Sequence, residues 1–391
     1  MSRGYRVAMV AACPFPCARG TPIRIRRMAE ALARRGHDVH VVSYDLRQGD
    51  EPLPFTVHRT SHLTGYHRVE PGPTAAKLML LDPMLVRVLR RVLREHPFDV
   101  IHAHHYEGLL VALRARGRRR IPIVYDGHTL LENELPYYPL GLPRAAKRAI
   151  GRLLDRRLPR RADHVIAVSD AIADTLAAAG GVPAERMAVI PNGVELEAFT
   201  GTGERRDNGP RLVFAGNLAP YQRIDLLFRS LRTVVDARAD ARLLIVGAES
   251  LEPYGGLADE LGVRGRIDTI ASDFGGLPAH LAAAHVALNP RTACAGVPQK
   301  LLNYMAAGKP IVSFAGSAKV LEHGRTGWLV PDEDAAAFGR AVLALLDDPE
   351  LARALGDAAR RHVAEHFSWE RTAERVEVVY GKLTGGGTPR R

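Results

Sequence analysis

A chain of 391 residues is long enough for two α/β domains, and its 46% apolar and 6% aromatic content is typical of Ala- and Leu-rich helices on parallel sheets. This composition excludes a disordered chain, and without an apolar run of roughly 18 residues the sequence predicts no membrane-spanning helix. The formal net charge is +11, and residues 87–161 alone carry 17 basic and 7 acidic side chains, a net +10.

Apolar runs alternate with helical patterns through the first half of the chain. The run 5–12 is followed by apolar residues at near-helical spacing that stop at Gly36, a residue type that ends helices. Ser169 has the side chain of a helix N-cap. The strands predicted here are 5–12, 37–43, 98–103, 121–125, 164–168 and 187–190.

The second half repeats this architecture without repeating the sequence. Residues 200–210 are Gly-rich and lack apolar periodicity, so they read as a linker. The strands predicted after it are 212–215, 242–246, 267–270, 286–288 and 310–314. Alternating strands and helices predict parallel sheets covered on both faces, with ligands at the carboxyl ends of the strands.

The expected fold class is therefore α/β, with two doubly wound, Rossmann-like domains that face a cleft. The expected divisions are a first domain at 1–198, a linker at 199–210, a second domain at 211–367, a helix at 368–383 and a disordered tail at 384–391. Three cysteines (Cys13, Cys17 and Cys294) and the absence of a signal-peptide pattern indicate a reducing, cytoplasmic setting.

Residues 296–310 read as a loop, a short helix and a strand. Pro298 suits the start of the helix and Gly308 its end, and a helix N-terminus of this kind suits a diphosphate. By spacing alone, an ordinary α/β helix explains the segment better than a diphosphate site does. The segment nevertheless resembles the donor-site signature of family 4 glycosyltransferases, retaining enzymes of the GT-B fold. Segments 37–39, 165–169, 189–194 and 324–331 resemble that family's other motifs, in the same order.

This resemblance implies transfer of a sugar from a nucleoside-diphosphate sugar to a glycan, lipid-linked or small-molecule acceptor, with retention and without a cofactor or metal. It implies a glycine loop at Gly20 and Thr21 beside the donor, and an active-site histidine at His128. A loop histidine at a strand end can donate a hydrogen bond or act as a base. Asp126, Glu132 and Glu134 are the alternative polar groups in that loop.

The sequence departs from the family pattern at four donor-site positions. Ala295 and Asn303 stand where the family usually has two glutamates, although Asn303 retains the capacity to bind a ribose hydroxyl. The backbone of Ala295, Gly296 and Val297 can still contact a sugar. Asn217 and Gln222 stand where it usually has an Arg and a Lys that contact the diphosphate. We expect Arg223 and Lys300 to supply the missing charge.

Two groups of residues have side chains that bind metals, but neither completes a metal site. Cys13 and Cys17 are only two ligands, and the histidines 102, 104 and 105 follow a strand without a matching set of partners. The sequence therefore predicts no metal site.

The basic region includes an amphipathic segment at 143–161. It carries apolar residues on one helical face and many arginines beside them, so it fits either a core-packed helix with a solvated side or a helix lying on an anionic membrane. The apolar positions are Ala146, Ile150, Leu153, Leu154 and Leu158. In the second case the protein is peripheral on the inner face of the membrane.

Three other functions compete with sugar transfer. The altered donor-site residues also fit a degenerate glycosyltransferase that acts as a binding or partner subunit. A sugar epimerase of the same scaffold needs no acceptor, which product analysis would show. A nucleic-acid binder fits least, since no aromatic and basic interleaving is present, and no nucleic-acid partner is expected.

Overall fold

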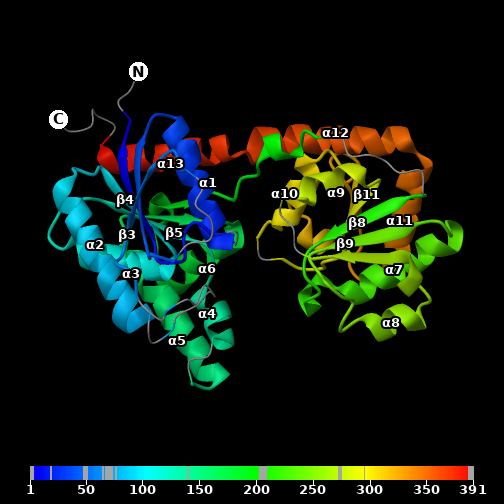
Figure 1. Cartoon of the computed structure of the whole chain (residues 1–391), viewed down its shortest axis with the longest axis horizontal. Helices are drawn as coiled ribbons and strands as arrows, with labels where there is room; N and C mark the ends of the chain where they lie inside the picture. The colour runs from blue at the N-terminus through cyan, green and yellow to red at the C-terminus, as the bar shows by residue number, and fades with distance from the viewer. Residues whose placement is uncertain are drawn as a thin grey trace. The chain divides into compact units, whose positions relative to one another are not determined.

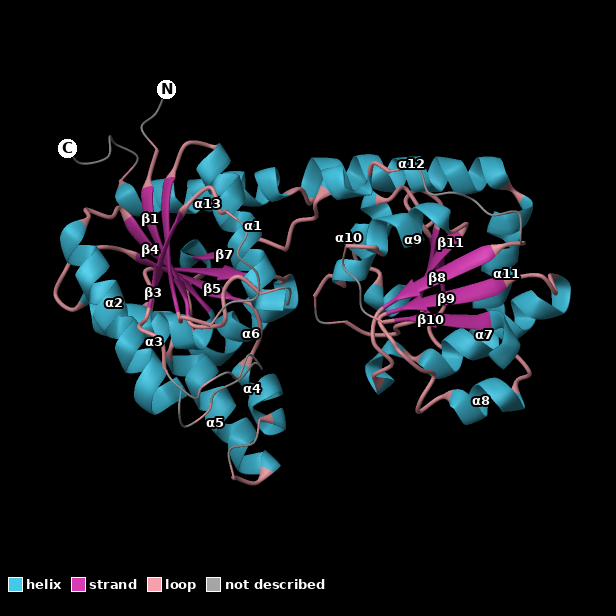
Figure 2. Ribbon diagram, in the orientation of Figure 1, coloured by secondary structure: helices cyan, strands magenta, loops and turns pink. Residues whose placement is uncertain are grey.

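The computed structural model describes residues 4–17, 20–46, 52–63, 66, 74, 77–138, 141–201, 209–271, 275–294 and 296–385. These residues form two compact units, the first within 1–192 and 369–391 and the second within 193–368. Each unit contains a parallel sheet with helices packed around it (Figures 1 and 2).

The sheet of the first unit has seven parallel strands in the order β3-β2-β1-β4-β5-β6-β7. Its central strands are continuous runs of apolar and β-branched residues because both faces of the sheet are buried. The strands are β1 (Arg6–Ala11), β2 (Asp38–Ser43), β3 (Thr56–Arg59), β4 (Val100–His104), β5 (Ile123–Gly127), β6 (His164–Ala167) and β7 (Met187–Val189).

Two hydrophobic cores flank this sheet, one shared with α1 and α13 and the other with α2 and α3. Helix α13, the last of the chain, packs along α1 and is tied to it by the ion pairs Arg34–Glu370 (2.7 Å) and Arg35–Glu377 (2.5 Å). The helical segments are α1 (Gly20–Arg34), η1 (Lys77–Leu81), α2 (Asp82–Glu95), α3 (His105–Arg116), α4 (Leu131–Glu134), η2 (Leu135–Tyr137), α5 (Arg144–Arg157), η3 (Pro159–Arg161), α6 (Asp170–Gly180), η4 (Ala184–Arg186) and α13 (Trp369–Thr384).

The sheet of the second unit has six parallel strands in the order β10-β9-β8-β11-β12-β13. They are β8 (Arg211–Ala215), β9 (Arg242–Val246), β10 (Ile267–Ile270), β11 (Val286–Asn289), β12 (Ile311–Phe314) and β13 (Trp328–Val330). The helical segments are η5 (Leu196–Phe199), η6 (Pro220–Gln222), α7 (Ile224–Ala237), α8 (Gly255–Glu260), η7 (Arg264–Arg266), α9 (Leu277–Ala283), α10 (Gln299–Ala306), η8 (Ala315–Ser317), α11 (Ala335–Asp347) and α12 (Pro349–His366).

The expected α/β class with two parallel sheets is confirmed, as are the eleven strands predicted from apolar runs, with bounds that differ by at most two residues. The side chain of Ser169 caps α6 by accepting from the amide of Ile172, as expected. Two strands, β3 and β13, were not predicted. Most of the linker expected at 199–210 and of the tail expected at 384–391 lies outside the described residues.

Within the described parts of the chain, we find no helix that is both long and apolar enough to traverse a bilayer.

Candidate active site

The carboxyl ends of three neighbouring strands bring the expected N-terminal site residues together. Gly20 and Thr21 begin α1 after β1, and His128 directly follows β5. All three line one pocket of about 400 Å³ within the first unit. The pocket is therefore where the resemblance expected the glycine loop and the active-site histidine to meet.

His128 is nearly buried and both of its ring nitrogens have neighbours. Nδ1 lies 3.1 Å from the hydroxyl of Thr21, and Nε2 lies 3.4 Å from Nδ1 of His104 and 3.5 Å from Oδ2 of Asp126. Burial lowers the pKa of His128, and the opposing charge of Asp126 only partly offsets this. The imidazole is therefore neutral at pH 7.

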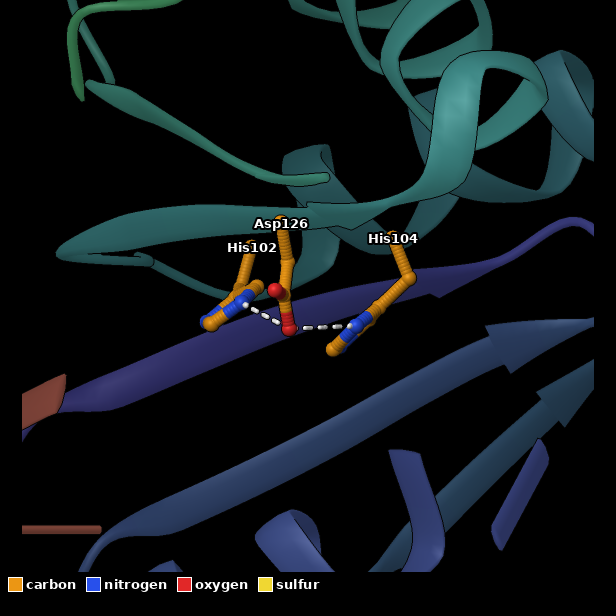
Figure 3. Close-up of side chains that lie close together, drawn as sticks. All are labelled: His102, His104 and Asp126. Carbon is orange, nitrogen blue, oxygen red and sulfur yellow. Dashed lines mark ion pairs between the residues drawn. The ribbon is translucent and has the colours of Figure 1, made fainter. Parts of the chain in front are cut away.

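Asp126 is the centre of a polar cluster that the sequence analysis mentioned only as an alternative. Arg24 Nε donates to Oδ2 at 2.9 Å and Arg24 Nη2 donates to Oδ1 at 3.1 Å. His102 and His104 approach the same Oδ2, at 3.5 and 3.2 Å (Figure 3). Burial disfavours the charged carboxylate, but Arg24 and the histidines hold its pKa well below the usual range.

This cluster is also the one set of three side chains, within the described residues, whose ligand atoms lie close enough to hold a metal ion. The fit is poor, because the guanidinium of Arg24 already occupies both oxygens of Asp126. A cation bound here would lie beside a buried positive charge. We therefore assign no metal to it.

A second ionic cluster on the pocket wall escaped the sequence analysis. His105 contacts Glu107 at 2.6 Å, Thr129 at 3.2 Å and Glu134 at 3.5 Å, and Lys77 pairs with Glu107 at 3.6 Å. Burial opposes the charge on His105, but Glu107 and Glu134 outweigh it and raise its pKa to about 10. The pocket wall therefore carries cations and carboxylates together.

His105 adopts a left-handed backbone conformation, with φ of 62°. This conformation is unfavourable for a residue with a Cβ, and it turns the chain sharply from β4 into α3. No sequence pattern indicates a left-handed conformation in a histidine, so this turn at His105 could not be predicted from the sequence.

In the second unit, Lys300 of α10 lies beside the loop that follows β8. Its Nζ donates to Oε1 of Gln222 at 2.6 Å and lies 4.0 Å from the centre of the Phe214 ring. Burial, with Arg291 nearby, lowers the pKa of Lys300 well below its usual value. Among the described residues no carboxylate forms an ion pair with it. Two expected site residues, Gln222 and Lys300, are therefore in direct contact.

Arg223, the other expected phosphate cation, is already neutralised. Its guanidinium pairs with Asp225 at 3.1 Å and with Glu333 at 2.7 Å. Arg291, which follows β11, is a cation without a carboxylate partner among the described residues, and the sequence analysis missed it. It stacks on Tyr221 at 4.9 Å, and its buried Nε has no hydrogen-bond partner.

The remaining expected donor residues are distributed around α10. Gly296 and Val297 precede the helix and are partly buried, while the side-chain amide of Asn303 makes no hydrogen bond to the rest of the described chain. Asn217 is exposed, and its Oδ1 accepts from the amide of Ala219 at 3.2 Å. Ala295 lies outside the described residues.

Comparison with known proteins identifies the class. Residues 18–198 match the family model described as Glycosyltransferase Family 4, and residues 209–348 match the one described as Glycosyl transferases group 1. A D-inositol 3-phosphate glycosyltransferase from Geodermatophilus obscurus is 30% identical, over 93% of this chain and 84% of the relative. A phosphatidyl-myo-inositol mannosyltransferase from Mycobacterium leprae is 26% identical, over 98% of both chains.

Among solved structures, a sucrose-phosphate synthase from Thermosynechococcus elongatus superposes with a TM-score of 0.75 at 21% identity, over 98% of this chain and all of that one. Two parallel sheets of this kind and these relatives define a nucleotide-sugar-dependent glycosyltransferase of the GT-B fold. The chain belongs to glycosyltransferase family 4, whose enzymes are retaining and need no metal.

Proposed function

We propose that this glycosyltransferase binds the diphosphate of its donor in the second unit, with Lys300 and Arg291 as the two cations. The observation that carries the proposal is a nearly buried ammonium group with an amide and an aromatic ring as neighbours in place of a carboxylate. Burying an uncompensated charge is unfavourable, so a site of this kind is suited to an anionic ligand.

The start of α10 adds to the anion-binding character of this region. Pro298 is the N-cap residue and makes no side-chain hydrogen bond to the first turn, so backbone amides of that turn remain available to a ligand. Asn303, one turn further along the helix, has its side-chain amide available for a ribose hydroxyl. Diphosphate and nucleoside then contact the same helix.

In this proposal the acceptor enters the pocket of the first unit, beside His128. As the bond from the sugar to the diphosphate breaks, negative charge develops on the leaving oxygen, and Lys300 and Arg291 stabilise it. Fixed donors of this kind contribute about 3–4 kcal/mol each to a transition state. The neutral imidazole of His128 exchanges a hydrogen bond with the acceptor hydroxyl.

We further propose that the first unit lies on an anionic membrane through α5. The core-packed alternative is wrong for two of the expected apolar positions, since Ile150 and Leu153 are 39% and 44% exposed. The buried side of the helix carries Lys147, Gly151 and Asp155 instead. Exposed apolar residues among arginines are the pattern of a helix that lies in a membrane interface.

The rim of the acceptor pocket also exposes large apolar and aromatic side chains near basic residues. Lys77 and Tyr138 line the pocket. Met79, two residues after Lys77, is 75% exposed, and Tyr137, next to Tyr138, is 78% exposed. The guanidinium of Arg144 lies 5.9 Å from the centre of the Tyr137 ring. Tyrosine and arginine of this kind are common at lipid headgroups. This supports a lipid-linked acceptor whose polar headgroup enters the pocket, with the enzyme peripheral on the cytoplasmic face.

Donor binding is tested by calorimetric titration of UDP, GDP, ADP and dTDP and their sugar conjugates. We expect Lys300→Met and Arg291→Met each to weaken the preferred donor at least tenfold, and Arg223→Gln to weaken it far less. Equal losses for all three, or a loss for Arg223→Gln alone, would contradict the assignment. If no nucleotide binds the wild-type protein, the degenerate partner subunit becomes the better function.

Membrane attachment is tested by flotation with vesicles that contain anionic phospholipid, and with zwitterionic vesicles as the reference. We expect the wild type to float only with anionic vesicles. The variant Ile150→Ser/Leu153→Ser, whose changes lie on the exposed side, should stay at the bottom of the gradient. The matched control is Val378→Ser, an exposed apolar residue of α13. Equal flotation of both variants would remove α5 from the proposal.

A further inference from the structure

We propose that Asp126 fixes the tautomer and orientation of His128, and that Tyr380 of the last helix supports this through His102. Asp126, His102 and Tyr380 are positioning residues, and His128 is the residue that reaches the pocket. A catalytic role for His128 rests on the proposed function, but the positioning itself does not.

The geometry places four nitrogen atoms around a single carboxylate oxygen. Oδ2 of Asp126 lies 2.9 Å from Nε of Arg24 and 3.2 Å from Nδ1 of His104. Nε2 of His102 and Nε2 of His128 are each 3.5 Å away. These side chains come from α1, β4, β5 and the loop after β5, so the cluster joins several elements beneath the pocket.

The tautomers follow from this arrangement, because an ionised carboxylate can only accept hydrogen bonds. Nε2 of His102 makes no hydrogen bond, but it lies 3.5 Å from Oδ2, and the charge of the carboxylate favours a proton on this nitrogen. The hydroxyl of Tyr380, 2.6 Å from Nδ1 of His102, is then the donor to that nitrogen. His104 carries its proton on Nδ1, the nitrogen that faces Oδ2.

The same argument fixes His128. Its Nε2 lies 3.5 Å from Oδ2 of Asp126 and 3.4 Å from Nδ1 of His104, and the negative charge of the carboxylate favours a proton on this nitrogen. Nδ1 is then left as the acceptor for the hydroxyl of Thr21 at 3.1 Å. Thr21 lines the pocket. A substrate hydroxyl that replaces Thr21 would therefore meet a lone pair of His128 and not an N–H group. This is the role of the aspartate in a catalytic triad, where the carboxylate holds the imidazole in one tautomer.

Burial and the charges near His128 keep its imidazole neutral at pH 7. Arg24 on α1 and His105 on α3 both disfavour a second proton on the ring, Asp126 favours it, and burial outweighs the carboxylate. His104 has its pKa lowered to about 3, chiefly by burial and by His102. Beside these two imidazoles, Arg24 and Asp126 form a buried ion pair at 2.9 Å.

Tyr380 explains why the last helix belongs to this site. Its ring is fully buried in the core between the sheet and α1, where an apolar side chain would pack without any polar partner. A tyrosine there requires a hydrogen-bond acceptor, and His102 provides it. A buried polar network in an apolar core is favourable only when its members are satisfied, and it then specifies one arrangement.

The test is long-range ¹H–¹⁵N spectroscopy of the full chain labelled with ¹⁵N-histidine, with His128 assigned by its loss in His128→Gln. At pH 7 we expect wild-type His128 as the neutral Nε2–H tautomer. In Asp126→Asn we expect a mixture of tautomers or the Nδ1–H form. In Tyr380→Phe, which changes no charge, the Nε2–H share of His128 should fall and the His102 signals should change.

The matched control is Tyr125→Phe, one residue from Asp126 but packed in the core on the opposite face of the sheet. It should leave His128 unchanged. If Asp126→Asn fails to fold because Arg24 is left unpaired, Tyr380→Phe decides alone. A protonated or Nδ1–H His128 in the wild type would overturn the proposal, as would an unchanged His128 in Tyr380→Phe or an equal change in Tyr125→Phe. None of these spectra needs a substrate. If the protein bound no nucleotide, the proposed function would be wrong, and the spectra would still decide whether Asp126 positions His128.

Discussion

The ammonium group of Lys300 lies 2.6 Å from the amide oxygen of Gln222, and its other close neighbour is an aromatic ring, Phe214. A glutamine in this place binds the lysine without neutralising it. The family usually has a cation at the position of Gln222. Here the amide instead holds Lys300 of a neighbouring helix in place, so the region keeps a basic side chain.

The first prediction follows from the burial of that charge. Lys300→Met keeps the length of the side chain and removes the desolvated ammonium group, so the protein without donor should gain about 1 kcal/mol of unfolding free energy. The expected rise in Tm is about 2–4 °C for a unit of this size, measured by calorimetry. A lower Tm would mean that the ammonium group stabilises the empty site, contrary to our interpretation.

Asp155 is predicted to hold α5 against the start of α4. Its carboxylate accepts from the hydroxyl of Tyr106 and from the amides of Leu131 and Glu132, the last two at 2.9 Å. Asp155→Ala would leave these buried donors unpaired, at a cost of about 3 kcal/mol. Thermal unfolding should show the loss, while Asp174→Ala, an exposed change on α6, should stay within about 0.5 kcal/mol. Similar values for both would contradict the role of Asp155.

Stability should fall on mild acidification because of a histidine cluster on β2, β3 and the end of α2. Burial, followed by the charges of His40 and His96, lowers the pKa of His58 to about 4, and burial also lowers the pKa of His40. Between pH 6.5 and 4 the unfolded chain therefore binds more protons than the folded protein, so the unfolding free energy falls as the pH falls.

Since His58 is partly exposed, we expect its share of this loss to be roughly 1 kcal/mol. The other charged groups near the cluster are Arg91, Glu95 and Asp38. Denaturant unfolding at pH 7 and pH 5 measures the difference. His58→Gln should reduce it, and an unchanged difference in that variant would exclude the cluster as the cause.

Gly247 is predicted to be indispensable for the loop beside Lys300. Its φ is +120°, and a Cβ built on it would lie 2.9 Å from the carbonyl oxygen of Gly216. Gly247→Ala should therefore cost at least about 2 kcal/mol through strain and displacement of that loop, and should weaken donor binding as well. Gly256→Ala on α8, where a Cβ meets nothing within 4 Å, is the control and should be neutral or stabilising. Equal unfolding curves would contradict the prediction.

The sequence was sufficient for most of the fold because parallel strands buried on both faces are continuous apolar runs. β3 did not fit this rule, since it is a four-residue edge strand with His58 and Arg59 among its residues and no residue buried. β13 has only three residues. Helix α5 shows a different limit. The sequence placed its apolar residues on one face of the helix, but it could not show which face the unit buries.

Some residues of the candidate site could be predicted from the sequence and others could not. Gly20, Thr21 and His128 lie in local motifs, so a resemblance could locate them. The pairing of Arg223 with Glu333 joins residues 110 positions apart, and Lys77 of η1 meets Glu107 of α3 through the packing of two segments. Such contacts depend on the tertiary structure alone. For that reason the neutralisation of Arg223 and the availability of Arg291 were not predicted.

The most direct test of the central claim is a thermal-shift panel of UDP, GDP, ADP, dTDP and their sugar conjugates, on the wild type and on Lys300→Met. A ligand that binds only the folded state adds about 2.7 kcal/mol at 100 times its dissociation constant. We predict a clear rise in Tm with one nucleotide class for the wild type, and a much smaller rise for Lys300→Met. A wild type that no nucleotide stabilises, or a Lys300→Met variant that responds as the wild type does, would contradict a donor site built on Lys300.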